Sequence, residues 1–127
     1  MVKVTWEHVH LRSPDPEATA RWYHNNLGAD VIRTANADGS TRIDLNLAGQ
    51  KVFIAKADPA KAAGAPSSPY MGLDHFGLTV ENLDAAVAEL KGKGVVFTME
   101  PTQIRAGTKI AFLTAPENVS IELLQRG

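Results

Sequence analysis

"WEHVHLRSPDPEATA" (residues 6–20) and "LDHFGLTVENLDAAV" (residues 73–87) align when the chain is shifted by 67 positions, so that His8 falls on His75. The same shift places "TRIDLNLAGQKVFIAK" (residues 41–56) on "TKIAFLTAPENVSIEL" (residues 108–123). Apolar, capping and turn residues agree over both pairs of stretches. Because self-similarity at a fixed period indicates a repeated architecture, we predict that the chain is an internal duplication.

Each half has the same predicted order of elements. In the first half, a strand "VTWEHVHL" precedes a helix with Asp15 as its N-cap, Pro16 in its first turn and Gly28 as its C-terminal stop. In the second half, a strand "LDHFGLTV" precedes a helix from "NLDAAVAEL" to "KGKG". Three strands then follow in each half. In the first half they are "ADVIRTA", "TRIDLNLA" and "KVFIAKA", and in the second they are "VVFTM", "TKIAFLT" and "VSIELLQ". We therefore predict an α+β fold in which two βαβββ units form a single domain, with the following bounds: domain 1–127, units 3–57 and 73–125, linker 58–72.

Composition limits the classes of function. The chain has 127 residues, 44% of them hydrophobic and 21% charged, which is typical of a globular domain. A formal net charge of −1 without a basic run argues against nucleic acid as a partner. The absence of cysteine excludes disulfides, thiol nucleophiles and cysteine-bound metals. No stretch reaches the about 18 apolar residues of a membrane span, so we expect a cytoplasmic protein that acts on a small molecule and not at a membrane.

Alternation along the predicted strands places three metal-ligating residues on open sheet faces. In a half-buried strand the apolar residues face the helix and the others face solvent or a ligand. This rule puts His8, His75 and Glu122 on the faces away from the helices. Two imidazoles and one carboxylate can bind Zn, Ni, Co, Mn or Fe, so the three residues are candidate ligands of one divalent metal ion if these faces close around one cavity. The shift of 67 pairs Glu122 with Ala55, so it offers no symmetric fourth ligand.

Other polar and aromatic side chains are predicted on the same faces. His10 lies two positions after His8 and is read either as a pocket-lining proton donor or as a solvated histidine. The row of polar residues in "TRIDLNLA" either lines the cavity, in which case the substrate is rich in oxygen, or forms a solvated face. The candidate substrate-binding residues are Trp6, Arg42, Asp44, Asn46, Phe53 and Lys109.

The duplicated βαβββ plan, with "HVHLRSPDPEATARWYHNNLGADVI", "LDHFGLTVENLD" and "APENVSIELLQ", resembles the vicinal oxygen chelate superfamily. That group includes glyoxalase I, methylmalonyl-CoA epimerase, extradiol dioxygenases, fosfomycin-resistance transferases and bleomycin-resistance proteins. The resemblance implies curved mixed sheets that form a half-open barrel around a metal cavity, with His8, His75 and Glu122 as the ligands, and a homodimer. Glyoxalase I and the epimerases have a fourth ligand, Glu or Gln, where the shift places Ala55.

The favoured functional hypothesis is a glyoxalase-type isomerase or lyase. A divalent ion would bind two adjacent oxygens of a small substrate and stabilise an enolate, with Glu122 as base and His10 as acid. One alternative keeps the same three ligands and makes the protein an Fe(II) extradiol-type ring-cleaving dioxygenase. A second alternative is a metal-free binding protein of the bleomycin-resistance type, which would have no need of the two matched histidines.

Overall fold

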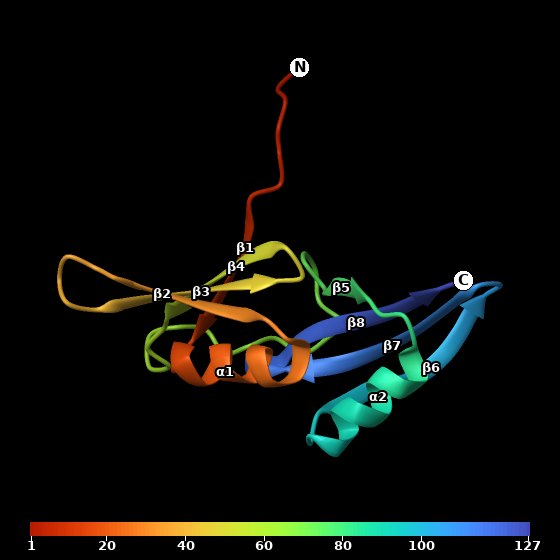
Figure 1. Ribbon diagram of the computed structural model, residues 1–127. Coiled ribbons are helices and arrows are strands. Elements are labelled where there is room, and N and C mark those ends of the chain that lie inside the picture. The colour runs from red at the N-terminus through yellow and green to blue at the C-terminus, as the bar shows by residue number, and fades with distance from the viewer. The chain divides into compact units, whose positions relative to one another are not determined.

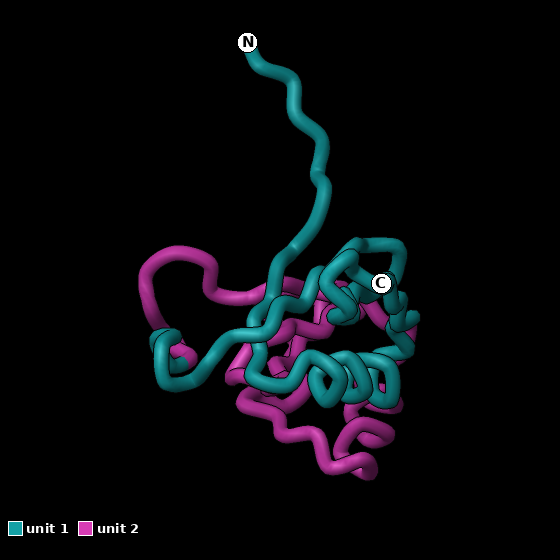
Figure 2. Tube along the Cα trace, turned by 90° about the vertical axis from the view of Figure 1, so that its left-hand side faces the viewer, with its two compact units in different colours: residues 1–64 teal, residues 65–127 magenta.

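The computed structural model describes residues 1–127 and divides the chain into two compact units, residues 1–64 and 65–127 (Figure 2). Each unit contains one α-helix and four strands in the order βαβββ (Figure 1). The predicted α+β fold of two βαβββ units is therefore confirmed. No helix is of the length and apolar character that crossing a membrane requires.

Unit 1 is a four-stranded mixed sheet with one helix on one face. Its strand order is β1-β4-β3-β2, in which β1 and β4 are parallel and the other neighbours antiparallel. The helix face is the core, where Tyr23 of the helix and Leu45, Val52 and other apolar side chains of the sheet are buried. The elements are β1 (His8–Ser13), α1 (Pro16–Leu27), β2 (Asp30–Ala35), β3 (Thr41–Leu47) and β4 (Gln50–Lys56).

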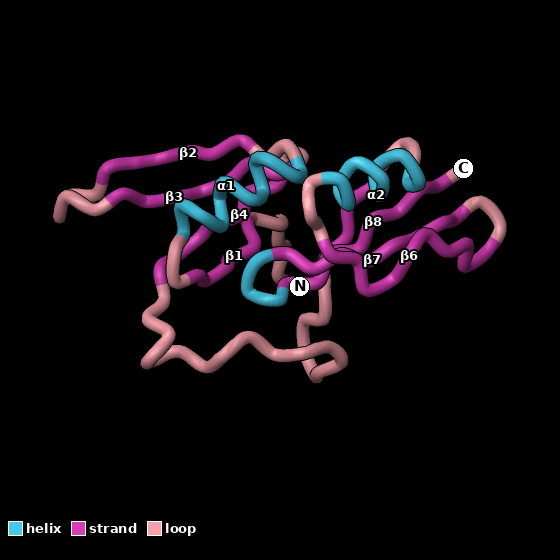
Figure 3. Tube along the Cα trace, turned by 90° about the horizontal axis from the view of Figure 1, so that it is seen from below, coloured by secondary structure: helices cyan, strands magenta, loops and turns pink.

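Unit 2 repeats this plan with the strand order β5-β8-β7-β6. Its core lies between the helix and one face of the sheet and includes Leu83, Leu113, Ile121 and Leu123. The long segment 57–75, which precedes the first strand of this unit, contains no helix or strand (Figure 3). The elements are β5 (Phe76–Thr79), α2 (Leu83–Gly92), β6 (Val96–Arg105), β7 (Thr108–Ala115), the 3-10 turn η1 (Pro116–Asn118) and β8 (Val119–Arg126).

The predicted ends of α1 are confirmed. The Asp15 side chain accepts a hydrogen bond from the Ala18 N–H at 3.1 Å, and Pro16 is the first helical residue. Gly28 ends the helix with φ of 70°, and its N–H donates to the His24 carbonyl at 3.2 Å. This left-handed conformation is one that glycine adopts without steric cost.

Two predicted strands begin too early. β1 starts at His8, so Trp6 precedes it, and β5 starts at Phe76, so His75 precedes it. The reason for the late start of β1 is its single partner: β1 pairs only with β4, which itself begins at Gln50 after a tight turn. Earlier residues therefore have no strand with which to form a ladder.

The constant shift of 67 positions fails in the last strands of the two units. Across β3 and β4, Asp44 lies opposite Phe53, whereas across β7 and β8 Phe112 lies opposite Glu122. The structural counterpart of Glu122 is therefore Phe53, and the pairing of Glu122 with Ala55 was wrong.

A slip of one position between β3 and β7, where Asp44 matches Phe112 68 positions later, overturns the predicted face of Lys109. A register error of one residue moves a side chain to the opposite face of the sheet. The Lys109 ammonium lies 2.7 Å from the carboxylate of Asp84 on α2. Lys109 thus faces the helix side of its sheet, and its predicted place on the open face was wrong.

We expect Asp15→Ala to lower the free energy of unfolding by about 1 kcal/mol, because the Ala18 N–H loses its capping acceptor. Urea denaturation followed by circular dichroism measures this change. Asp30→Ala is the matched control: Asp30 is an exposed carboxylate on β2, so its removal should change stability by less than about 0.5 kcal/mol. Equal losses in the two variants would contradict the capping role.

Candidate functional site

His75 and Glu122, two of the three predicted metal ligands, meet within unit 2. His75 directly precedes β5, and Glu122 lies on β8 opposite Gly77. The His75 Nε2 atom is 3.0 Å from the Glu122 Oε1 atom. A Cβ atom on Gly77 would lie 3.1 Å from a Leu124 methyl and 3.8 Å from Glu122 Oε1, so glycine keeps this part of the sheet face open beside the carboxylate.

Asp74 holds the other ring nitrogen of His75. Its Oδ1 atom is 2.7 Å from His75 Nδ1, and its Oδ2 atom accepts a hydrogen bond from the Ser68 hydroxyl at 3.0 Å. Neither Asp74 nor Ser68 was among the predicted site residues. One signal was available for Asp74, because an acidic residue, Glu7, also precedes the matched histidine of the first half.

The protonation of His75 follows from its two carboxylate neighbours. The hydrogen bond with Asp74 raises the pKa of His75, partial burial opposes this, and the contact with Glu122 adds to the increase. The pKa of Asp74 is lowered by the hydrogen bonds from His75 and Ser68. An imidazolium ring can donate to both acceptors at once, whereas a neutral ring would direct a lone pair at one of them.

This donor set fits a divalent metal ion. With Nδ1–H directed at Asp74, the neutral His75 ring offers its Nε2 lone pair beside the Glu122 oxygen. Two ligand atoms that bind one ion at right angles, each about 2.1 Å from it, lie about 3.0 Å apart, as these two atoms do. In neither unit do three His, Asp or Glu side chains gather as a complete metal site, so the pair needs a further ligand.

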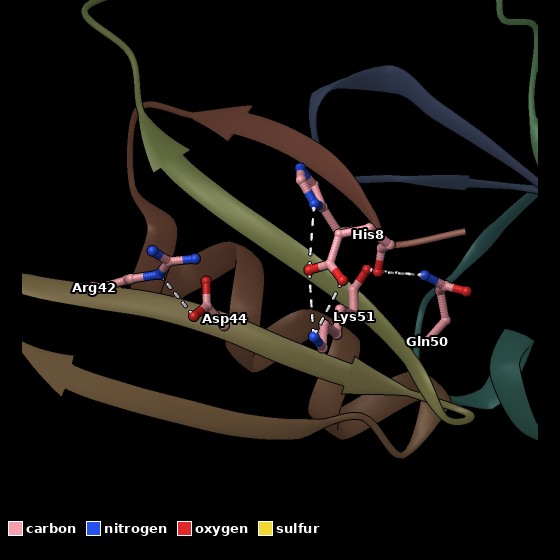
Figure 4. Close-up of polar contacts among 6 residues, drawn as sticks. His8, Arg42, Asp44, Gln50 and Lys51 are labelled. Atoms are coloured by element: carbon pink, nitrogen blue, oxygen red, sulfur yellow. Dashed lines mark hydrogen bonds and ion pairs between the residues drawn. The ribbon is translucent and has the colours of Figure 1, made fainter. Parts of the chain in front are cut away.

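His8 and His10 lie on the open face of the unit 1 sheet. The His8 ring stacks on the Phe53 ring with centroids 4.1 Å apart, and the His10 ring meets Phe53 edge-on at 6.3 Å. His8 Nδ1 is 3.9 Å from a carboxylate oxygen of Glu7, and Figure 4 shows this contact at one end of the ring. The His8 Nε2 atom has no hydrogen-bond partner, so it is available as a ligand.

Arg42 and Asp44 form an ion pair on the same open face. The Arg42 Nε atom donates to Asp44 Oδ2 at 2.8 Å (Figure 4), and the guanidinium carbon lies 4.5 Å from the centre of the Phe53 ring. Together with His10, these side chains line a cavity of about 710 Å³ in unit 1.

Two other predicted substrate-binding residues do not line this cavity. The Asn46 side-chain oxygen accepts a hydrogen bond from the Gly49 N–H at 2.8 Å, so it closes the turn between β3 and β4. Trp6 precedes β1 and is 75% exposed. Of the six predicted substrate-binding residues, the structure therefore brings together three: Arg42, Asp44 and Phe53.

Comparison with known proteins agrees with this fold. YwkD, an uncharacterised protein of Bacillus subtilis, is 30% identical over 94% of both chains. The human mitochondrial methylmalonyl-CoA epimerase is 29% identical over 93% of this chain and 72% of its own length. The crystal structure of a glyoxalase family protein from Enterococcus faecalis superposes with a TM-score of 0.76 and 25% identity, covering 95% of this chain and 97% of its own.

A family model also matches nearly the full length of the chain, over residues 5–123. Its description is the Glyoxalase/Bleomycin resistance protein/Dioxygenase superfamily. The match includes both βαβββ units and the segment between them, so it agrees with the duplication seen in the sequence and with the two sheets of the structure. The chain therefore belongs to the Glyoxalase/Bleomycin resistance protein/Dioxygenase superfamily.

Proposed function

We propose that the protein is a divalent-metal-dependent isomerase or lyase that moves a proton on a small, oxygen-rich substrate. The observation that carries the proposal is the pair of ligand atoms, His75 Nε2 and Glu122 Oε1, at 3.0 Å. In this proposal His75 and Glu122 hold the ion, and the role of His8 as third ligand stays a prediction. A relative that is named as an epimerase supports an isomerase reaction. The homodimer and the cytoplasmic location stay predictions.

The proposed chemistry divides between the ion and the side chains. When bound, the ion would supply Lewis-acid polarisation to two adjacent oxygens of the substrate. Glu122 takes the substrate proton, because its second oxygen, Oε2, has no hydrogen-bond partner and its side chain is only 16% exposed. His10 lines the cavity of unit 1, and its role as proton donor stays a prediction.

The first test is metal content. We expect protein purified without chelator to hold about one divalent ion per chain, and His75→Ala or Glu122→Ala to reduce this at least about tenfold, because each removes a ligand atom. Elemental analysis of the purified protein measures the ratio. His24→Ala is the matched control. The His24 ring contacts the Ala29 carbonyl just beyond the C-terminal end of α1, so its removal should not change the metal content.

Two results would contradict the proposal. One is wild-type protein without stoichiometric metal, and the other is unchanged metal content in both ligand variants. Iron together with substrate-dependent oxygen uptake would instead support a dioxygenase.

We also expect Asp74→Asn to weaken metal binding about tenfold, because a neutral amide holds the His75 ring less firmly than a carboxylate does. Isothermal titration calorimetry of metal-free protein with Zn²⁺ measures the dissociation constant. Asp84→Asn is the control, because Asp84 pairs with Lys109 on the helix side of the sheet. Equal affinities in Asp74→Asn and wild type would show that Asp74 does not support His75.

A further inference from the structure

Two arginines flank a small residue on the open face of the unit 1 sheet. Arg12 of β1 pairs with Ala55 of β4. On the other side of β4, Ile43 pairs with Ile54, so the preceding residue of β3, Arg42, reaches the level of Ala55. Because neighbouring strands are about 4.8 Å apart, the backbones of the two arginines are about 10 Å apart with only a methyl group between them.

Arg42 is fixed in place while the end of its side chain stays free. Its Nε atom is bound to Asp44 at 2.8 Å, and its guanidinium lies over the Phe53 ring. The two terminal nitrogens of Arg42 have no hydrogen-bond partner, and in Figure 4 the dashed line from Arg42 to Asp44 starts at the Nε atom. An arginine that is already positioned loses little conformational freedom when these nitrogens bind a ligand.

The burial of Asp44 stabilises its ion pair with Arg42. The Asp44 side chain is 17% exposed, and its Oδ1 atom is shut off from water with no hydrogen-bond partner. Displacing Arg42 would leave a largely buried negative charge without its counter-ion, which is costly. Asp44 therefore holds Arg42 in place.

Arg12 supplies a second cation on the same face. It shares this face with His8 and His10, because side chains two positions apart in a strand point the same way. Arg12 is exposed, and no carboxylate pairs with it. Ala55 and Arg42 line the cavity of about 710 Å³, and Arg12 lies next to Ala55 on the neighbouring strand.

We propose that Arg12 and Arg42 bind a small oxyanion, a carboxylate or a phosphate group, in the space over Ala55. The planar guanidinium groups donate paired hydrogen bonds that match the oxygens of either group. That this anion is part of the enzyme's substrate rests on the proposed function. Anion binding itself does not rest on it, because neither the arginines nor Ala55 is a proposed metal ligand.

The test uses full-length protein treated with chelator, so that its outcome is independent of metal binding. Malonate and inorganic phosphate are titrated separately by isothermal titration calorimetry at constant ionic strength. We expect Arg12→Met to weaken binding of the preferred anion about tenfold, because one charged donor is lost. We expect Ala55→Leu to weaken it to a similar degree, because the larger side chain occupies the space while both arginines remain.

Lys51→Met is the matched control. Lys51 is a cation on β4 opposite His8, and its ammonium pairs with Glu7 at 3.3 Å. Removing the Lys51 ammonium should change the anion affinity less than about twofold, because only the long-range electrostatic attraction between protein and anion is reduced.

The outcomes separate the alternatives. Tighter binding of malonate identifies a carboxylate site and tighter binding of phosphate a phosphate site, and both support the proposal. The anion-binding proposal is overturned if neither anion binds the wild type, or if Arg12→Met and Ala55→Leu bind the anion as tightly as the wild type does. It is also overturned if Lys51→Met loses as much affinity as Arg12→Met. Should Ala55→Leu fail to fold, the comparison of Arg12→Met with Lys51→Met decides. Anion binding without metal binding would refute the proposed function alone.

Discussion

In both units one helix covers one face of the sheet, and the structure of each unit depends on this burial. Because strand side chains alternate, burying every second residue against a helix commits the residues between them to the opposite face. Ile121 and Leu123 are fully buried, and this fixes Glu122 on the open face between them. In unit 1, burial of Val52 and Ile54 does the same for Phe53. The positions of the candidate site residues thus follow from apolar packing.

The repeat and the alternation were enough to predict the fold, the ends of α1 and the open faces of β1, β4 and β8. They were not enough for β7, because a single shift assumes that connections in the two halves have equal length. Two residues, Ala48 and Gly49, join β3 to β4, whereas the three residues of η1 join β7 to β8. This difference affects only the match of Phe53 with Glu122. Lys109 was assigned to the wrong face because the offset has already changed before β7, where Asp44 matches Phe112, 68 positions later.

The candidate site was predictable in its residue types and less so in its contacts. His75 follows from the duplicated pattern and Glu122 from the alternation along its strand, and the two side chains lie 3.0 Å apart. The hydrogen bond from Ser68 to Asp74 depends on the path of the segment 57–75, which has no periodic pattern to read. The hydrogen bond between Arg42 and Asp44 depends on the conformation of the two side chains. Alternation places both residues on one face of β3 but does not predict that they are in contact.

The two units have exchanged a carboxylate and a phenyl ring between equivalent positions. Unit 1 carries Phe53 on its fourth strand and Asp44 beside it, whereas unit 2 carries Glu122 on its fourth strand and Phe112 beside it. The two units therefore share a backbone fold but carry different side chains on their open sheet faces. A chimaera built from two copies of the second half would contain the His75–Glu122 arrangement twice, and one built from two copies of the first half would lack it. Replacing either half by a copy of the other would therefore keep the scaffold and remove one set of open-face side chains.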